Sequence, residues 1–227
     1  MMDTNIQDAP DLGDMTLDEM RLALAPAIAD AAIFDGWGTE ALDMAAEQMG
    51  VDKDVARLAF KGGAMDMVEA WIEAVDIAMV DAFPEDVVAP MKIRERIRAL
   101  VQFRLDAVAG QEEAVRRAVA IMAMPQNVAR AAKRSWRSAD LMWRLAGDTA
   151  TDYNHYTKRA ILASLYGATL SVFIEDDSMD KAETKAFLER RIEGVMQFEK
   201  FKAKWLNPER ESFSITRFLG RLRYPAR

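Results

Sequence analysis

The sequence contains no cysteine and a single histidine, His155. The lack of cysteine excludes disulfides and thiol catalysis, and it is typical of proteins that work in a reducing compartment. With one histidine, the chain can form neither an HExxH zinc site nor the paired Glu-x-x-His units of a four-helix di-iron site. We therefore expect His155 to be a surface residue near a helix start, not a base or a metal ligand.

The motifs of other enzyme classes are also lacking. The chain has no GxGxxG, no P-loop and no GxSxG. Its two acidic pairs, Glu112-Glu113 and Asp176-Asp177, are adjacent and are not spaced to converge on a substrate. Because anions stabilise helix N-termini, we interpret both pairs as solvated helix starts. The sequence therefore predicts no catalytic residue, no metal site and no cofactor.

Long apolar runs are absent as well, since none approaches the roughly 20 residues that span a bilayer. The first fifteen residues carry four Asp and no Lys or Arg. Secretory signals and mitochondrial transit peptides both need basic residues there, so neither is expected. The chain has 227 residues, of which 51% are apolar and 30% charged. This composition is typical of a soluble globular protein with one or two domains.

Apolar residues recur at helical spacing nearly throughout, and no segment alternates as a strand would, so the predicted fold class is all-α. Thr16-Leu-Asp-Glu19 is a capping box that predicts the start of a first helix, which should end at Gly36. Further helices are expected over 39–50 with Thr39 as cap, 52–60, 64–83, 91–108, 111–123, 127–147 with Asn127 as cap, 153–175, 179–205 and 212–223. A boundary is expected near Gly63, where short helices give way to long ones.

Residues 39–61 resemble a helix-turn-helix, with Gly50 in the turn. Their electrostatics oppose DNA binding. Residues 1–60 carry thirteen acidic and three basic residues, a net charge of −10, and the third helix begins with Asp52 and Asp54. Because DNA affinity depends on neutralising phosphates, we expect a degenerate motif that binds no nucleic acid.

The most specific pattern runs from Trp143 to Arg191. It joins a Gly-Asp turn, a Tyr-rich helix start, a long apolar helix, an Asp-Asp-Ser turn and a second amphipathic helix. This order resembles the C-terminal domain of the ubiquinone-biosynthesis accessory family called coenzyme Q protein nine. Upstream, Met122-Ala-Met-Pro125-Gln-Asn127 resembles the family's Ala-Leu-Pro-x-Asn turn. The resemblance covers about 20–200.

The family resemblance implies a TetR-like fold, in which a three-helix, helix-turn-helix-like subdomain precedes a larger helical ligand-binding bundle. On this basis four regions are expected along the chain. They are an acidic N-terminus (1–15), the degenerate helix-turn-helix subdomain (16–63), a helical lipid-binding domain (64–205) and a basic amphipathic tail helix (206–227).

The resemblance also implies an internal cavity that binds an isoprenoid or another lipid. The chain has fifteen Met and five Trp, and flexible Met side chains line adaptable sites. Gly167 would permit close approach of a helix or a ligand. The candidate lipid-binding residues are Met122, Trp136, Trp143, Leu162, Leu165 and Tyr166. An ordinary filled core, which would show the same stripes, is the alternative.

Residues 151–159, TDYNHYTKR, resemble the family's TD-x-x-WYTRR, a region implicated in docking the di-iron hydroxylase of the pathway. His155 stands where the family has Trp, which removes a large apolar anchor, and Lys158 replaces the first Arg. The implied partner-binding residues are Asp152, His155, Tyr156 and Arg159. A solvated, well-capped helix start is the alternative.

The C-terminal end is basic, because residues 200–227 hold eight Lys or Arg and two Glu, a net charge of +6. Apolar residues at positions 215, 218, 219 and 222 form one stripe with arginines around it, the pattern of a helix that lies on an anionic membrane. The candidate membrane-binding residues are Ile215, Arg217, Phe218, Leu219, Arg221 and Leu222. A helix that packs this stripe onto the protein body is the alternative.

Together these expectations describe a non-enzymatic lipid-binding accessory protein of ubiquinone biosynthesis. It would present a quinone-precursor lipid to a membrane-associated hydroxylase of the pathway, from an anionic membrane surface. We expect a homodimer by analogy with TetR proteins, and a location in the bacterial cytoplasm, peripheral to the inner membrane. The alternatives are a TetR-type transcriptional regulator that binds a small hydrophobic effector and a structural adaptor with a filled core.

Overall fold

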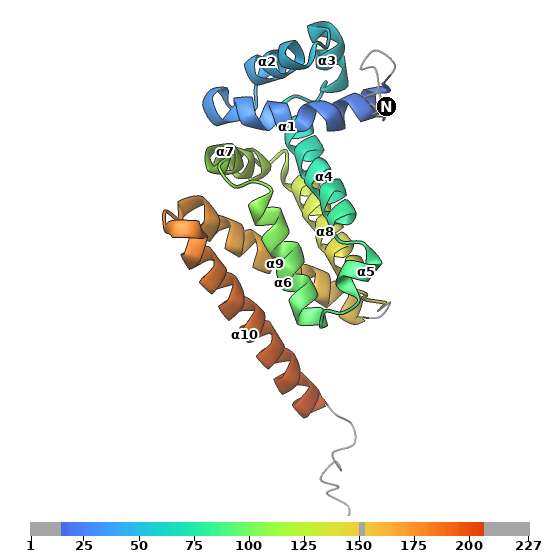
Figure 1. Ribbon diagram of the computed structural model, residues 1–227, viewed down its shortest axis with the longest axis vertical. Coiled ribbons are helices and arrows are strands. Elements are labelled where there is room, and N and C mark those ends of the chain that lie inside the picture. The colour runs from blue at the N-terminus through green and yellow to red at the C-terminus, as the bar shows by residue number, and fades with distance from the viewer. Residues whose placement is uncertain (1–14, 150–152, 207–227) are drawn as a thin grey trace, which may run out of the picture. The chain divides into compact units, whose positions relative to one another are not determined.

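The computed structural model describes residues 15–149 and 153–206, and within these ranges the chain is helical with no strand (Figure 1). The predicted all-α fold class is confirmed. The helices are α1 (Leu17–Asp35), α2 (Thr39–Met49), α3 (Lys53–Ala59), α4 (Ala64–Ala82), α5 (Glu85–Val88), α6 (Ile93–Asp106), α7 (Glu112–Met122), α8 (Val128–Leu145), α9 (Tyr153–Glu175) and α10 (Ala182–Leu206), the last preceded by a 3-10 turn (Met179–Lys181). Only the single turn α5 was not predicted.

The helix ends follow their capping residues. Thr16 and Glu19 form the predicted capping box, in which the Thr16 N–H donates to Glu19 at 2.8 Å and the Glu19 N–H donates to the Thr16 hydroxyl at 3.3 Å. At the other end of α1, Gly36 adopts a positive φ of 73°, which few other residues tolerate, and the helix stops there as predicted.

Two predicted caps differ from the structure. Gly38 occupies the N-cap of α2, so Thr39 is the first helical residue. Asn127 does precede α8, but its side chain donates to the Ile121 carbonyl of α7 at 2.8 Å and caps no amide of α8. Asn127 therefore ties two helices together.

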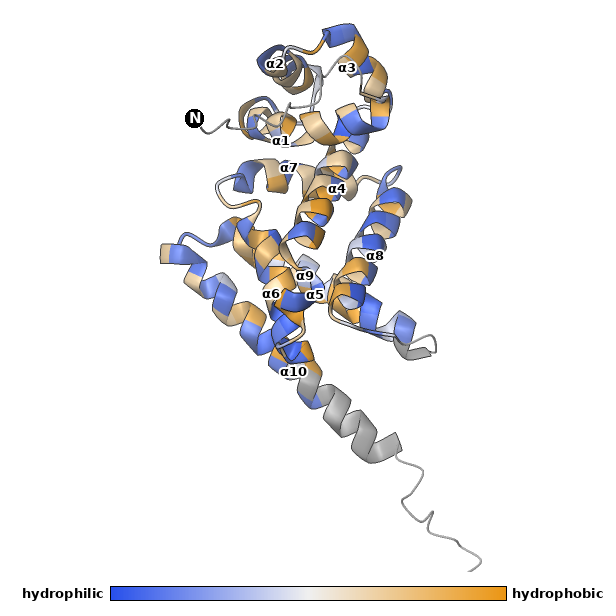
Figure 2. Ribbon diagram, turned by 45° about the vertical axis from the view of Figure 1, so that its right-hand side comes forward, coloured by the Kyte–Doolittle hydropathy of each residue, from blue (hydrophilic) through white to orange (hydrophobic). Residues whose placement is uncertain are grey.

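The first three helices pack around small side chains. α1 packs against α2, α3 and α4, and the contact with α2 is close because that helix presents alanines. Among these, Ala41, Ala45 and Ala46 are almost fully buried. Helix α4, which is largely apolar, also packs against α6, α7 and α8, and α9 packs against these same three helices (Figure 2).

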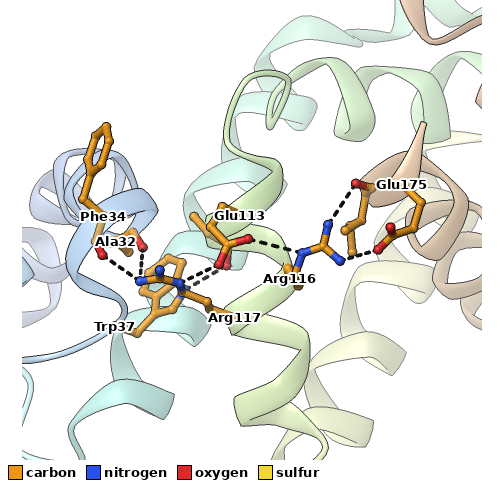
Figure 3. Close-up of polar contacts among 9 residues, drawn as sticks. Ala32, Phe34, Trp37, Glu113, Arg116, Arg117 and Glu175 are labelled. Atoms are coloured by element: carbon orange, nitrogen blue, oxygen red, sulfur yellow. Dashed lines mark hydrogen bonds and ion pairs between the residues drawn. The ribbon is translucent and has the colours of Figure 1, made fainter. Parts of the chain in front are cut away.

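Helix α7 joins α1 to α9 (Figure 3). On one side, the Trp37 indole donates to the Ala114 carbonyl at 2.9 Å, and Arg117 donates to the Phe34 carbonyl at 2.9 Å. On the other side, Arg116 pairs with Glu175 at the end of α9. These contacts fix α7 between the first three helices and the larger bundle.

By packing, the chain divides into a compact unit that ends at Leu188 and a second unit from Glu189 onward, whose described residues continue α10. Among the described residues, no helix has the length and apolarity to cross a bilayer. The predicted tail helix at 212–223 lies outside the described residues.

Asp176 corrects one prediction. Asp177 is exposed, as expected of a solvated pair, but Asp176 is buried. Its carboxylate accepts the backbone N–H and the hydroxyl of both Ser178 and Thr184, at distances of 2.5 to 2.9 Å. Burial opposes ionisation of Asp176, but these four donors outweigh it and hold its pKa well below the ordinary carboxyl value. The carboxylate thus connects the end of α9 to the start of α10.

We expect Asp176→Asn to lower the free energy of unfolding by about 1–3 kcal/mol at pH 7. The substitution replaces one accepting oxygen by an NH₂ group, which would face hydrogen-bond donors. A carboxyl whose pKa is depressed in the folded state stabilises the fold above its unfolded pKa, and this stabilisation is lost as pH falls below about 4. The variant should therefore show a smaller decline in stability in acid, measured by urea unfolding between pH 2 and 7. Asp177→Asn, the exposed control, should stay within about 0.5 kcal/mol of the parent. Equal effects of the two substitutions would contradict the role given to Asp176.

Candidate functional site

A cavity of about 240 Å³ lies in the larger bundle, with walls from α4, α6, α7, α8 and α9. Most of its walls are apolar. Helix α4 contributes Trp71, Ile72 and Val75, and α7 contributes Val115, Ala118, Val119 and Met122. The exposed residues among the lining are Val119, Ser135, Gly167 and Ser171. They belong to α7, α8 and α9, so the opening of the cavity lies among these three helices.

The structure brings only two of the six candidate lipid-binding residues to this cavity, Met122 and Tyr166. Leu162 and Leu165 are buried in the core without lining it.

The two tryptophans of α8 face elsewhere. The Trp136 ring lies 6.0 Å from the Tyr156 ring, between centroids. The Trp143 indole donates to the Lys158 carbonyl at 2.9 Å.

The helical period explains these misplacements. On α8 the lining residues are Arg134, Ser135, Ser138 and Met142. Trp136 and Trp143 follow two of these by one position, which turns a side chain by about 100° around the helix axis. The same offset separates Leu162 and Leu165 from the lining residues of α9. The sequence therefore indicated the right helices but not the face that each turns to the cavity.

A buried polar cluster from three helices forms part of the cavity wall. Arg104 of α6 pairs with Asp76 of α4, and the Ser138 hydroxyl of α8 donates to Asp76 at 2.8 Å. The Arg104 guanidinium lies 4.9 Å from the centroid of the Tyr166 ring, a cation–π distance. Burial alone would lower the pKa of Arg104, but Tyr166 and Asp76 raise it above the ordinary value. Sequence reasoning missed this cluster, because Arg104 lies on a helix with many other charged residues.

Two of the candidate partner-binding residues form an aromatic surface with a residue of α8. We define it as Trp136, His155 and Tyr156. Tyr156 is 63% exposed, and its ring centroid lies 5.1 Å from that of His155 and 6.0 Å from that of Trp136. The indole of Trp136 thus places a large ring beside Tyr156, although position 155 holds a histidine.

Arg159 is not available on this surface, which corrects its assignment as a partner-binding residue. It is only 2% exposed. Its Nε donates to Asp140 at 2.6 Å, and its Nη1 donates to Asp148 at 3.0 Å and to the His155 carbonyl at 3.1 Å. Because these acceptors lie on α8, on the turn that follows it and on α9, Arg159 holds the two helices together.

Two basic residues of the helix-turn-helix-like region, Lys53 and Arg57, are paired within the protein. Lys53 lies 2.9 Å from Glu47, and Arg57 pairs with Asp43 at 2.6 Å and Asp54 at 3.1 Å. These cations would have to leave acidic partners before they could neutralise phosphates, which opposes DNA binding. The expectation that the motif binds no nucleic acid stays a prediction.

Several predicted residues lie outside the described part of the chain. These are the partner-binding candidate Asp152 and the membrane-binding candidates Ile215, Arg217, Phe218, Leu219, Arg221 and Leu222. Within the described residues, no group of three or more His, Asp or Glu side chains is arranged to hold a metal ion.

We expect Arg159→Met to lower the free energy of unfolding by about 1–3 kcal/mol, because it removes the buried hydrogen bonds to Asp140, Asp148 and the His155 carbonyl, although Asp140 keeps Arg144 and Asp148 keeps Lys158 as ion-pair partners. Arg144 offers a matched control, since it pairs with the same Asp140 at 2.8 Å but is 63% exposed. Arg144→Met should cost less than about 1 kcal/mol. Urea unfolding of both variants measures the difference, and similar losses would show that Arg159 has no special role in joining α8 to α9.

Comparisons with known proteins identify similar sequences. The COQ9 family model matches residues 128–199. Ubiquinone biosynthesis protein COQ9, mitochondrial, of Homo sapiens is 29% identical over 168 residues, which cover 71% of this chain and 52% of the human protein. The protein of the same name from Rattus norvegicus is also 29% identical, over 71% of this chain and 54% of its own length. The chain thus spans about half the length of the curated relatives it matches. The resemblance predicted from Trp143 to Arg191 is confirmed.

A solved structure, the TetR transcriptional regulator from Nitrosomonas europaea ATCC 19718, superposes with a TM-score of 0.64 at 22% sequence identity. The match covers 79% of this chain and 99% of that chain. At this identity the likeness concerns the fold, and it confirms the TetR-like architecture.

Proposed function

We propose that this chain, which carries the COQ9 family match over residues 128–199, is a non-enzymatic lipid-binding accessory protein of ubiquinone biosynthesis. The observation that carries the proposal is the position of the cavity. Nine of the eighteen residues that line it lie on α8 and α9, within the matched region. The part of the chain that resembles COQ9 therefore builds half of a mostly apolar cavity.

An apolar cavity is suited to take up part of a lipid. An isoprenoid that moves from a bilayer into such a cavity stays in apolar surroundings. Each Å² of its apolar surface that is kept from water contributes about 25 cal/mol of favourable free energy. The volume of about 240 Å³ is too small for a whole polyprenyl chain, since ligand pockets usually measure about 300–1,000 Å³. We infer that one end of a quinone-precursor lipid enters, and that the rest leaves through the opening among α7, α8 and α9.

The aromatic surface is our proposed docking site for the pathway hydroxylase. Exposed Tyr and Trp side chains supply large contact areas and often dominate interface energies. Tyr156 is the most exposed of the three residues, and Trp136 supports it from α8. The aromatic surface and part of the cavity wall lie on the same two helices, α8 and α9. A partner docked on this surface would therefore sit close to the cavity.

We further propose that the basic tail binds an anionic membrane surface, that the protein is a homodimer, and that it works in the bacterial cytoplasm, peripheral to the inner membrane. The rival function, a TetR-type regulator with a small hydrophobic effector, would share the fold and the cavity. It is opposed by the paired cations Lys53 and Arg57 and by the net charge of −10 over residues 1–60.

We expect Ala163→Phe to reduce the lipid that co-purifies with the protein at least roughly tenfold, because Ala163 lines the cavity and a ring there would fill it. Ala160 is exposed on α9, one turn before Ala163, and does not line the cavity, so Ala160→Phe is the matched control. Native mass spectrometry of both variants measures bound lipid, and thermal melting checks that both are folded. Equal lipid in the two variants, or none in the parent protein, would refute lipid binding in this cavity.

The membrane step is tested by co-sedimentation with vesicles. The full chain should sediment with anionic vesicles and not with neutral ones, because each basic residue near such a surface contributes on the order of 1 kcal/mol. A chain ending at residue 207 should stay in solution with both. Binding by the shortened chain would place the membrane-binding segment outside the tail. Equal binding to anionic and neutral vesicles would contradict an electrostatic attachment.

A further inference from the structure

Helix α8 turns two cations to solvent that have no acidic partner in the described part of the chain. They are Lys133 and Arg137, which are both exposed and lie four residues apart, on one side of the helix. The other three cations of α8, Arg130, Arg134 and Arg144, each pair with a carboxylate. This side of α8 therefore offers positive charge to an acidic partner.

An uncovered apolar stripe runs beside these two cations. Val128, Ala132 and Trp136 follow one another at intervals of four residues, so they lie along one side of α8. Val128 is 50% exposed, Ala132 is exposed, and Trp136 is half-buried beside the Tyr156 ring. The stripe thus continues into the aromatic surface. We define the α8 face as this stripe together with the two cations.

The N-terminal segment, residues 3–14, has a composition that complements the α8 face. Its sequence is DTNIQDAPDLGD, which contains four Asp and no Lys or Arg. The apolar residues Ile6 and Leu12 lie between the Asp residues. Because matched charges favour one contact over others and apolar contact adds affinity, the segment matches both features of the α8 face.

The start of α1, where this segment joins the described chain, is connected to the start of α8 through Asp66. Burial opposes ionisation of Asp66, but hydrogen bonds from Arg130 and Gly62 and the charges of Arg130 and Arg21 lower its pKa. Arg130 lies in the first turn of α8 and is 2.6 Å from Asp66, and Arg21 lies near the start of α1. The starts of α1, α4 and α8 thus meet around one carboxylate.

The segment is long enough to cover the α8 face from this point. Its twelve residues span about 40 Å when extended, whereas the helix rises only about 14 Å from Val128 to Arg137. Attachment to the same molecule also gives the segment a high effective concentration at this face. Weak surface contacts are therefore sufficient for docking.

We propose that residues 3–14 dock on the α8 face of the same molecule. Their carboxylates lie beside Lys133 and Arg137, and their apolar side chains lie against the stripe that ends at Trp136. Docked there, the segment covers part of the aromatic surface and competes with any partner that binds it. The contact itself does not depend on the proposed function, and only the role as a competitor rests on it.

The test is carbodiimide crosslinking of the full chain, which joins a lysine amine directly to a carboxylate in contact with it. At low salt, peptide mass spectrometry should find a link between Lys133 and a carboxylate of residues 3–14, within a single chain on a denaturing gel. In 1 M salt, where the Debye length is about 3 Å, the link should disappear.

Lys61 is the internal control for this experiment. It is exposed, it has no acidic partner in the described part of the chain, and it follows Phe60, whose ring lies 5.8 Å from the Arg21 guanidinium of α1. Proximity to the start of α1 alone would link the segment to Lys61, but Lys61 has no second cation or apolar stripe of α8 beside it. We therefore expect a lower yield at Lys61 than at Lys133.

A second comparison neutralises one cation at a time. Arg137→Gln should lower the yield at Lys133 about two- to fivefold, the ratio that one surface ion pair supplies. Arg144→Gln is the matched control, because Arg144 is also exposed on α8 but already pairs with Asp140. This control should leave the yield at Lys133 unchanged.

The possible results are distinguishable. Links mainly at Lys61, or no link to the segment, would overturn the proposal. A link from Lys133 to the segment of a second copy, seen as a crosslinked dimer, would contradict docking within one molecule. Equal yields in the two variants, or a yield that persists in 1 M salt, would exclude the ion pairs. None of these results tests the cavity or the role in ubiquinone biosynthesis, so this inference can fail while the proposed function stands.

Discussion

The buried pair of Arg104 and Asp76 is the interaction on which the larger bundle depends. It joins α4 to α6, and Ser138 brings α8 to the same carboxylate. A charge inside a protein must keep its partner, because an unpaired one costs several kcal/mol, so these three helices are held at fixed separations. The cluster therefore fixes three of the five helices that line the cavity.

Helix α7 gives the cavity a connection to the first three helices. Its apolar face lines the cavity, while Arg117 and the Ala114 carbonyl contact the end of α1 and Trp37. The N-terminal helices and the cavity thus share one structural element. In this TetR-like fold, the helices that α7 connects to the cavity lie in a segment, residues 1–60, that carries a net charge of −10.

The sequence predicted the helices well and their contacts poorly, for a physical reason. Periodicity, the Thr16 capping box and Gly36 are local signals, and they located almost every helix to within a few residues. The face that each helix buries depends on distant partners. Arg104 meets Asp76 across 28 residues, and nothing near either residue reveals the pair. Family resemblance also gave no information on burial, since it assigned the buried Arg159 to a surface.

The contacts of α7 with the end of α1 bear on how the chain folds as it is synthesised. The last carbonyls of a helix lack partners within the helix, and in α1 the Phe34 carbonyl accepts a hydrogen bond from Arg117, more than eighty residues later. The Trp37 indole likewise depends on Ala114, 77 residues away. A ribosome must therefore extend the chain beyond α7 before the first three helices acquire these partners. The N-terminal helices are synthesised first, but their hydrogen bonds to α7 form only after the start of the following bundle has been synthesised.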